Sequence, residues 1–542
     1  MAKQTGPVTT QRERKAASAA AAAASLTSNT NETDPTSLEG DNSETNKPPH
    51  TEIPQEQFLR WFGLFASKHI SNDRVIQVGC LSFVILQAYI QFTAVDRTDA
   101  EMELVSTGIT GVLAFLVAIV IGHRVKVQAL PLEKQSEVKM PLWNNVYLGF
   151  LPAMLAYVLN AKELLAYNVA FTTTIIDLPF AVQIMTQTTF LTYNSAHYYG
   201  IFNLQMCVLH YGVNFFLKQV SHLKSLDPVE CNLFSILIVD LYLISSDLVY
   251  VVILQKLGIA FAVGVVVTFL LNIIIQGNNL LRSVAILAAW LGSFCYVALY
   301  LLDPILGENA VVWILDFITE TKQRQNILTV WLCSLLLLIP TIFNYRFSLS
   351  ANSRRKIWHF LILILVVYPL YVDPEFVKVC LSGTLVLFLM VEQLRYLKLS
   401  PFGEYLDTQL RTFTDFRDER GPLIFSYIYL MIGITFPILV NGSVVGLVVL
   451  GAGDSLASII GSTYGEIHWG KSKKTLEGTM TFVVATYAIC ALLKSMQWFF
   501  ADKSFHSLLL TCVVSGVLEG NSDLNDNILI PGFMVAMLEV LD

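Results

Sequence analysis

Long apolar stretches alternate with short polar ones along most of this chain. Apolar runs lie near residues 75–95, 104–122, 142–160, 164–192, 200–217, 232–254, 258–275, 283–302, 327–344, 357–372, 376–391, 423–440, 443–460, 479–494, 507–518 and 528–541. A helix needs about 20 apolar residues to cross a bilayer, and runs this continuous are typical of helices rather than of barrel strands. Because several runs are short or interrupted, the pattern predicts an all-α polytopic integral membrane protein with about 13–15 transmembrane helices.

Three regions follow from the same pattern. Residues 1–56 are polar, with an alanine run followed by Ser, Thr, Asn, Glu and Pro. Such a composition cannot bury a core, so we expect a disordered N-terminal tail. It has no apolar segment typical of a cleaved signal peptide, so the first hydrophobic helix is expected to target the membrane. Residues 57–344 form an N-terminal multi-spanning region without a recognisable catalytic motif, and residues 345–542 carry the polar clusters.

Composition agrees with the membrane prediction and narrows the function. Hydrophobic residues make up 54% of the 542 residues and charged residues only 14%, against about 25% charged in soluble proteins. The formal net charge of -7 offers no basic surplus, which argues against nucleic-acid binding. The eight cysteines are scattered singly, without the spacing of a zinc site.

The polar loops of the last region are expected to share one side of the membrane. Counting crossings from the loop at 345–356 places the loops at 392–422, 461–478 and 519–527 on its side. The opposite loops offer Lys503, with Lys494 at a helix end. The shared side carries Arg346, Arg354, Arg355, Lys356, Arg395, Lys398, Arg411, Arg417, Arg420, Lys471, Lys473 and Lys474. The positive-inside rule then places these loops in the cytosol.

Residues 451–479 carry the densest chemistry in the chain. Several glycines, Asp454 and three lysines lie between two apolar runs. Glycines let backbone N–H groups approach a polyphosphate, and lysines neutralise its charge. The segment Gly465–Ser472 formally fits a P-loop pattern, but a P-loop needs a preceding strand and a helix opening on Lys-Ser. We therefore predict a phosphate-binding loop that is not a P-loop.

Four polar groups surround this loop in the sequence. Asp454 lies among small residues, where it could hold Mg²⁺ beside phosphate or serve a small-residue helix interface. Lys356 and His359 share a helix face and could contact phosphate or form a cationic belt at the membrane surface. The clusters at 415–422 and 519–527 offer carboxylates for a metal or a base, or plain solvated turns.

These residues resemble the dolichol kinase family. The resemblance rests on Gly453-Asp454-Ser-Leu-Ala-Ser-Ile-Ile-Gly461, Gly465-Glu466-Ile467-x-Trp469, and Lys473-Lys474-Thr475-x-Glu477-Gly478-Thr479, supported by Arg355-Lys356-x-x-His359, the 415–422 cluster, and Glu519 with Asp526-Asn527. It implies transfer of the γ-phosphoryl group of CTP to the terminal hydroxyl of dolichol at the endoplasmic reticulum membrane. The family often has Pro after the tryptophan, where this chain has Gly470 followed by Lys471.

The resemblance also implies site residues. The family's cytosolic CTP-binding segment corresponds to Ser462, Thr463, Tyr464, Gly465, Glu466, Ile467, His468, Trp469, Gly470, Lys471, Ser472, Lys473, Lys474, Thr475, Leu476 and Glu477. We expect Lys473 and Lys474 to bind the phosphates and Asp454 to hold Mg²⁺. Asp418 or Asp526 would accept the hydroxyl proton, and the sequence does not choose between them.

Three other functions compete with this one. Another polyprenol or phytol-type kinase would share the motifs. Phosphatidate cytidylyltransferases also use CTP at membranes, but their C-terminal His-Gly-Gly…Asp-Arg…Asp pattern is absent here. A multi-spanning transporter would more often show internal repeats with paired broken helices, and the sequence shows no clear repeat. The oligomeric state does not follow from the sequence.

Overall fold

The computed structural model describes residues 71–93, 142–194, 200–221, 226–244, 248–275, 280–345, 350–400, 402–414, 421–470 and 472–541, with isolated residues between 107 and 119. The tail predicted at 1–56 lies outside these residues, as do Asp418 and Lys471. The described helices belong to one compact unit, Leu64–Asp542.

Helices are the only extended elements of regular secondary structure among the described residues, which otherwise form short links and one isolated β-bridge between His468 and Thr475, and this confirms the all-α prediction. The helices are α3 (Asn72–Thr93), α5 (Asn145–Val158), α6 (Lys162–Phe171), η2 (Thr172–Ile176), α7 (Phe180–Asn194), α8 (Gly200–Ser221), α9 (Pro228–Leu243), α10 (Val249–Ile274), α11 (Leu280–Leu306), α12 (Ala310–Thr319), α13 (Lys322–Tyr345), α14 (Ala351–Val372), α15 (Pro374–Tyr396), α16 (Gly403–Leu410), η4 (Arg411–Phe413), α17 (Ser426–Asn441), α18 (Val445–Val448), η6 (Val449–Gly453), α19 (Asp454–Tyr464), α20 (Leu476–Ser495), α21 (Phe505–Asn521) and α22 (Asp526–Leu541).

Eight helical segments in the described part of the chain are long and apolar enough to cross a membrane. One of them, Val445–Tyr464, is built from α18, η6 and α19 together, and four further apolar helices are shorter. The chain is therefore a multi-pass membrane protein, whereas the expected total of about 13–15 spans stays a prediction.

Polar side chains fix where several helices begin. The Asp373 side chain accepts from the Phe376 N–H at the start of α15, Thr475 accepts from Gly478 N–H at α20, and Ser504 accepts from Ser507 N–H at α21. These are the residue types that satisfy the unpaired N–H groups of a first turn. Short polar links between apolar helices thus set the helix boundaries locally.

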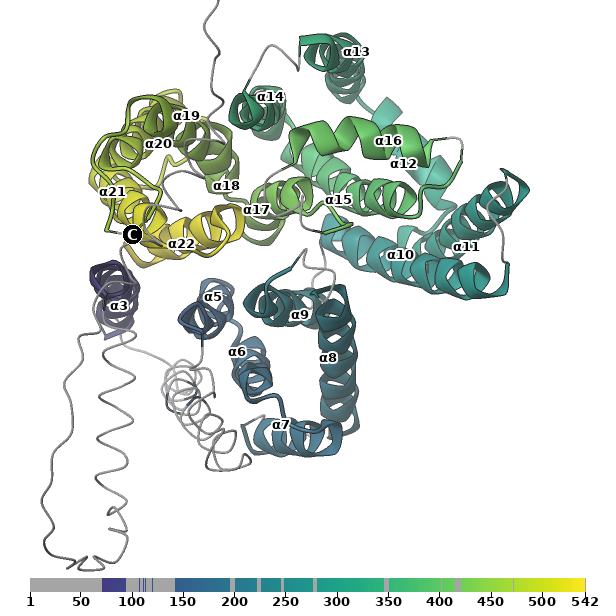
Figure 1. The fold of residues 1–542 in the computed structure, drawn as a ribbon, viewed down its shortest axis with the longest axis horizontal. Helices are drawn as coiled ribbons and strands as arrows, with labels where there is room; N and C mark the ends of the chain where they lie inside the picture. Colours follow the sequence, from purple (N-terminus) through teal and green to yellow (C-terminus); the bar gives the residue numbers. More distant parts are fainter. Residues whose placement is uncertain are drawn as a thin grey trace, which may run out of the picture. The chain divides into compact units, whose positions relative to one another are not determined.

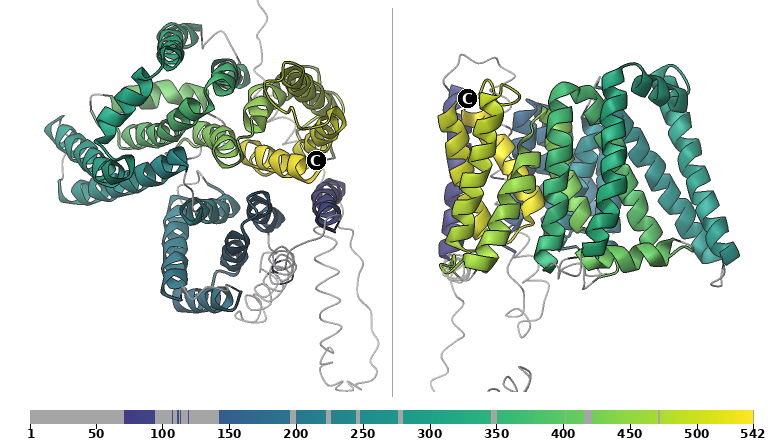
Figure 2. Two further views of the ribbon diagram at one scale, coloured as in Figure 1. Left: turned by 180° about the vertical axis from the view of Figure 1, so that it is seen from behind. Right: turned by 90° about the horizontal axis from the view of Figure 1, so that it is seen from above.

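The helices of the last region pack around one another and against α3. Helix α20 packs on α19 and α21, and α22 packs on α17, α21, α5 and α3. Figure 1 shows α19–α22 gathered together, with α3 beside α21 and α22, and the right-hand view in Figure 2 shows the helices running mostly along a common direction. A shared core of fully buried apolar side chains, including Leu450, Phe482 and Phe533, joins them.

Contacts between helix ends agree with alternating crossings. Tyr371 stacks on Trp498, and the link after α17 lies near Lys378, so the links at 373, 442 and 498 share one end of the bundle. At the other end, Asn352 bonds to Ser458 and the loop at 465–475 reaches the start of α22. The loops at 350, 465–475 and 522–525 therefore lie at a common end.

Candidate active site

Asp454 lies where a π-helical turn meets a regular helix. The turn η6 (Val449–Gly453) widens the chain just before α19 begins at Asp454. Such turns insert one residue per turn and often occur at functional sites. The Leu450 carbonyl accepts a hydrogen bond from Ser455 Oγ at 2.9 Å and lies 3.0 Å from His359 Nδ1. Because a carbonyl only accepts, this contact places the imidazole hydrogen on Nδ1.

A buried lysine from α14 pairs with this carboxylate. Lys356 Nζ lies 2.5 Å from Asp454 Oδ2, and His359 Nδ1 lies 3.9 Å from the same oxygen. Only 4% of Lys356 is exposed, so this lysine does not reach the membrane surface as a belt residue would. A buried charge is stable only when it is paired, and Asp454 supplies that pairing.

Small residues bring the helices of the site close together. An added Cβ on Gly453 would overlap the Thr486 hydroxyl of α20, and one on Gly451 would lie 2.6 Å from Leu363 Cβ of α14. Gly451 and Gly453 therefore form a tight helix interface. Such a small-residue interface was one of the two roles that the sequence allowed for this segment. That interface packs η6 against α14 and α20, directly before Asp454 begins α19.

Lys474 connects the loop after α19 to the start of α22. Its Nζ lies 2.7 Å from the Glu519 carbonyl, 2.9 Å from Glu519 Oε1 and 2.8 Å from Asp526 Oδ1. Burial disfavours the charge on Lys474, but the Asp526 and Glu519 carboxylates outweigh burial and raise its pKa above the usual value. The lysine is therefore a fixed positive charge between two acids.

Three carboxylates from three helices converge at this point. Oxygens of Asp454 (α19), Glu519 (α21) and Asp526 (α22) lie within 4.8 Å of one another. Two ammonium groups, those of Lys356 and Lys474, oppose these three negative charges. One negative charge therefore remains without a counter-charge. Carboxylate oxygens are the ligands that Mg²⁺ prefers. The donor set and its charge therefore fit a divalent cation.

The glycine- and lysine-rich loop folds back on itself beside the carboxylates. Trp469 N–H donates to the Lys474 carbonyl at 3.0 Å, and Leu476 N–H donates to the Ile467 carbonyl at 2.7 Å. The Trp469 indole donates to Thr479 Oγ1 at 2.9 Å and lies directly against Gly520. This pairing turns Lys474 inward.

The outer part of the same loop faces away from the protein. Ser462, Thr463, Tyr464, Glu466, His468 and Lys473 are exposed. Glu477 is bound to the loop, because its carboxylate accepts from the Ile467 N–H at 3.1 Å. The loop follows helix α19 rather than a strand, and α20 begins only at Leu476, so the strand and helix that define a P-loop do not flank it.

Gly470 stands where the resemblance to the dolichol kinase family would place a proline. Its φ is +46°, a left-handed conformation that a proline ring, fixed near −65°, cannot adopt. An added Cβ there would also overlap the Asp73 carboxylate of α3. The turn in this chain therefore takes a shape that only a residue such as glycine allows.

The structure thus brings together Asp454, Lys474 and Asp526, three residues singled out in the sequence. Lys473 is exposed on the outer loop, and Asp418 and Lys471 lie outside the described residues. Two members of the cluster, Lys356 and Glu519, had no firm role in the sequence analysis. The motifs around them were the available signal, but their partners lie in other helices, far away along the chain.

Known proteins resemble both halves of the chain. The family model described as the dolichol kinase N-terminal domain matches residues 27–245. The N-terminal half, whose residues show no catalytic motif, therefore carries a family pattern of its own. No solved structure matches the chain.

Curated relatives match between 43% and 73% of the chain. A dolichol kinase of Saccharomyces cerevisiae is 37% identical over 402 residues, which is 73% of this chain and 77% of the yeast protein. A human dolichol kinase is 30% identical over 45% of this chain and 50% of its own length. Dolichol kinase EVAN of Arabidopsis thaliana is 28% identical over 43% of each chain. From its sequence relatives, its helical membrane fold and the motifs that form the carboxylate cluster, the chain belongs to the dolichol kinase family.

Proposed function

We propose that this protein phosphorylates dolichol, transferring the γ-phosphoryl group of CTP to the lipid's terminal hydroxyl. The product, dolichyl phosphate, serves protein N-glycosylation and the synthesis of mannosyl donors. The observation that carries the proposal is the cluster of three carboxylates and two lysines beneath an exposed loop that bears the family's motifs. A substrate this apolar stays in the bilayer, where an enzyme embedded in the same membrane can reach it.

The loop from Ser462 to Glu477 is proposed to hold the nucleotide. Its outer residues are exposed, and Lys473 and Lys474 carry charges that complement a triphosphate. Twelve basic residues on the loops of the same side favour a cytosolic position. We therefore place the loop on the cytosolic face of the endoplasmic reticulum membrane, where nucleotides are available.

Asp454 and Glu519 are proposed to hold Mg²⁺. When bound there, Mg²⁺ would neutralise part of the charge on the nucleotide phosphates. Lys356 keeps Asp454 ionised and in place, since its ammonium group lies against the same carboxylate. Positioning and charge neutralisation are the main contributions that a protein makes to phosphoryl transfer.

Asp526 is proposed as the group that receives the hydroxyl proton. The dolichol oxygen forms a bond to the γ-phosphorus, the bond from this phosphorus to the β,γ-bridging oxygen breaks, and CDP leaves. The hydroxyl proton passes to the Asp526 carboxylate, which lies at the first residue of α22. Lys474, 2.8 Å away, orients this carboxylate and lies where it could neutralise charge on the leaving group.

The test is incorporation of labelled phosphate into lipid. Membranes containing the protein would be incubated with dolichol, Mg²⁺ and γ-labelled CTP or ATP, beside a Lys473→Ala/Lys474→Ala double variant. We expect label in the lipid from CTP with wild-type protein, and its loss in the variant. Label from ATP alone would overturn the nucleotide assignment, and no label from either nucleotide with folded protein would overturn the proposal.

A further inference from the structure

The wide turn η6 takes a backbone donor away from the Leu450 carbonyl. In a regular α-helix the Asp454 N–H would donate to the carbonyl four residues back, which is that of Leu450. In η6 it donates instead to the Val449 carbonyl, five residues back. Leu450 is fully buried, and a buried carbonyl that loses its partner destabilises a fold. The turn therefore needs a donor from a side chain.

Two buried side chains replace this donor. Ser455 Oγ donates to the Leu450 carbonyl at 2.9 Å, and His359 of α14 does so through Nδ1 at 3.0 Å. Ser455 is fully buried and only 5% of His359 is exposed, so both bonds are shielded from water. Because His359 belongs to another helix, its bond ties the backbone of η6 to α14.

Three polar contacts join α14 to the chain from η6 to α19. They are Asn352 with Ser458, Lys356 with Asp454, and His359 with the Leu450 carbonyl. The three residues on α14 are spaced i, i+4 and i+7, so they lie on one face of that helix. The contact from His359 reaches the backbone of the wide turn itself, and α14 therefore holds η6 in shape at this point.

The shape of η6 sets the direction in which Asp454 points. Asp454 is the first residue after the turn, and successive residues of an α-helix differ in direction by about 100°. If η6 closed up into a regular helix, the carboxylate would turn relative to the helices before it. Its oxygen would then leave the group that it forms with Glu519 and Asp526, in which the oxygens lie within 4.8 Å of one another.

We propose that His359 is a positioning residue of the cation site, which fixes the direction of Asp454 by holding the Leu450 carbonyl in the wide turn. The hydrogen on Nδ1 is used by that carbonyl and is not offered to a phosphate. The inference rests on the proposed function, and it replaces the phosphate contact that the sequence allowed for His359.

Binding of Mn²⁺ tests this role without turnover. Mn²⁺ prefers the same oxygen ligands as Mg²⁺, and electron paramagnetic resonance measures the free ion beside the full-length protein, without nucleotide or lipid. His359→Leu keeps a buried side chain but has no donor. We expect it to weaken Mn²⁺ binding about tenfold, as is typical when a residue that orients a metal ligand is lost.

Two further substitutions show which ring nitrogen matters. The amide nitrogen in His359→Asn is as many bonds from Cα as Nδ1, and the one in His359→Gln is as many bonds away as Nε2. We expect His359→Asn to bind Mn²⁺ within about threefold of wild type, because it keeps the donor, and His359→Gln to resemble His359→Leu. If Gln restored binding as well as Asn, or if neither restored it, the inference would be overturned.

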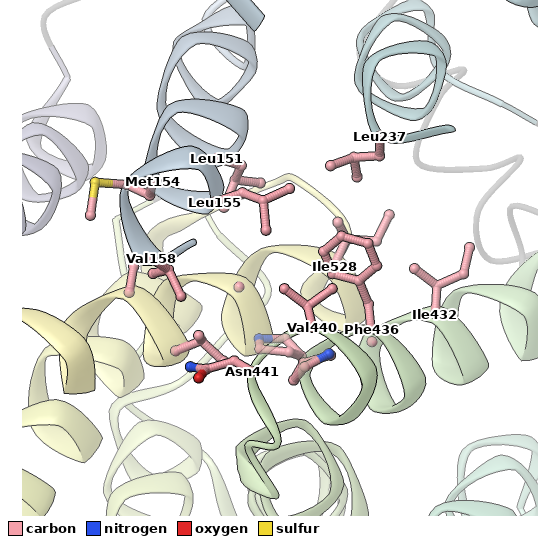
Figure 3. Close-up of a pocket in the computed structure, with 16 residues that line it drawn as sticks. Leu151, Met154, Leu155, Val158, Leu237, Ile432, Phe436, Val440, Asn441 and Ile528 are labelled. Atoms are coloured by element: carbon pink, nitrogen blue, oxygen red, sulfur yellow. The ribbon is translucent and has the colours of Figure 1, made fainter. Parts of the chain in front are cut away.

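Two controls separate positioning from a general loss of stability. Asn352→Ala removes a polar contact from the same face of α14, and Leu237→Ala removes packing at an apolar pocket between α5, α9, α17 and α22 (Figure 3). Both should lower the melting temperature, as His359→Leu does, yet leave the Mn²⁺ affinity within about twofold of wild type. An equal loss of affinity in all three variants would mean that His359 only supports the fold.

The two proposals fail separately. If the wild-type protein phosphorylates dolichol but His359→Leu binds Mn²⁺ as tightly, or if neither protein binds Mn²⁺, the positioning role is wrong and the kinase function stands. If Mn²⁺ affinity follows the expected order but no phosphate is transferred from any nucleotide, the kinase function is wrong and the positioning role stands.

Discussion

At the scale of single residues, Lys474 holds two acids that would otherwise repel each other. One ammonium group contacts both Glu519 and Asp526, and only 26% of its side chain is exposed. When one member of a buried ionic group is removed, the remaining charges lose their counter-charge. This lowers the stability of the fold by more than the intact ion pair contributes to it. Lys474 therefore supports both the stability of the site and its chemistry.

We expect Lys474→Met to lower the rate of lipid phosphorylation by about 100-fold or more, because the cluster loses its inward positive charge. The same change should lower the free energy of unfolding by about 3 kcal/mol, since the buried Glu519 and the partly buried Asp526 lose their shared partner. Lys474→Arg keeps the charge and serves as the control. A Lys474→Met protein with wild-type activity and melting temperature would contradict the assignment.

A second prediction concerns the carboxylates. Asp454→Asn or Glu519→Gln should raise the Mg²⁺ concentration needed for half-maximal activity about tenfold or more, because each removes a charged oxygen ligand. Activity would be titrated against Mg²⁺ at fixed CTP. Asp177→Asn is a matched control, since Asp177 pairs with Lys218 in an exposed position of the N-terminal region. If the Mg²⁺ concentration for half-maximal activity rose equally in all three variants, the assignment of Asp454 and Glu519 as Mg²⁺ ligands would be wrong.

At the scale of secondary-structure elements, the π-helical turn and the folded loop decide where the charged groups point. The turn η6 comes directly before Asp454, whose carboxylate lies near α14, α21 and α22, and the loop's internal bonds direct Lys474 toward α21 and α22. Both elements depend on glycine, because neighbouring helices occupy the space where a side chain would lie.

Gly453→Ala tests the close packing of η6. The added Cβ would overlap Thr486, so we expect a loss of about 1–3 kcal/mol in unfolding free energy together with a lower kcat. Gly383→Ala, in the middle of α15 with nothing within 4 Å of the added Cβ, is the control and should be neutral or stabilising. Thermal unfolding and labelled-CTP assays would measure both. Equal behaviour of the two variants would mean that η6 tolerates a side chain.

Removing the hydrogen bond between Trp469 and Thr479 tests whether that bond holds the loop in its shape. Trp469→Phe and Thr479→Val each remove this bond, at a cost of about 1 kcal/mol, and should raise the KM for CTP several-fold. In the double variant the effects should not add, because both changes remove the same hydrogen bond. Strict additivity would show that the bond does not hold the loop.

At the scale of the whole molecule, the N-terminal part of the chain supports the site at its other end. Gln77 of α3 donates to the Asn521 carbonyl at 2.5 Å and accepts from Trp143 and Tyr147, each at 2.7 Å. Tyr429 of α17 donates to Glu230 of α9 at 2.8 Å. These bonds join helices from both regions behind the carboxylate cluster, which gives the N-terminal region a structural role.

Gln77→Leu should therefore impair the enzyme from a distance. The substitution takes this partner from the buried Tyr147 hydroxyl and Asn521 carbonyl and from the partly buried Trp143 indole, at about 1–3 kcal/mol for a buried group left unsatisfied. We expect a lower melting temperature and an activity that declines at lower temperature than in wild type, with an unchanged KM for CTP at low temperature. Exposed Gln323 at the start of α13 offers a control, Gln323→Leu, with a single backbone bond to lose. Equal melting temperatures for all three proteins would contradict this role.

The sequence by itself determined the helical membrane character, and it singled out the glycine- and lysine-rich loop that is proposed to bind phosphate. These depend on neighbours within a few residues: continuous apolar runs, polar links such as Thr475, and glycines beside lysines. The tertiary structure alone decided that Lys356 pairs with Asp454, that Glu519 completes the carboxylate cluster, and that an apolar pocket opens between α5, α9, α17 and α22. Each of these joins helices far apart in the chain, and the packing that brings them together has no local signature.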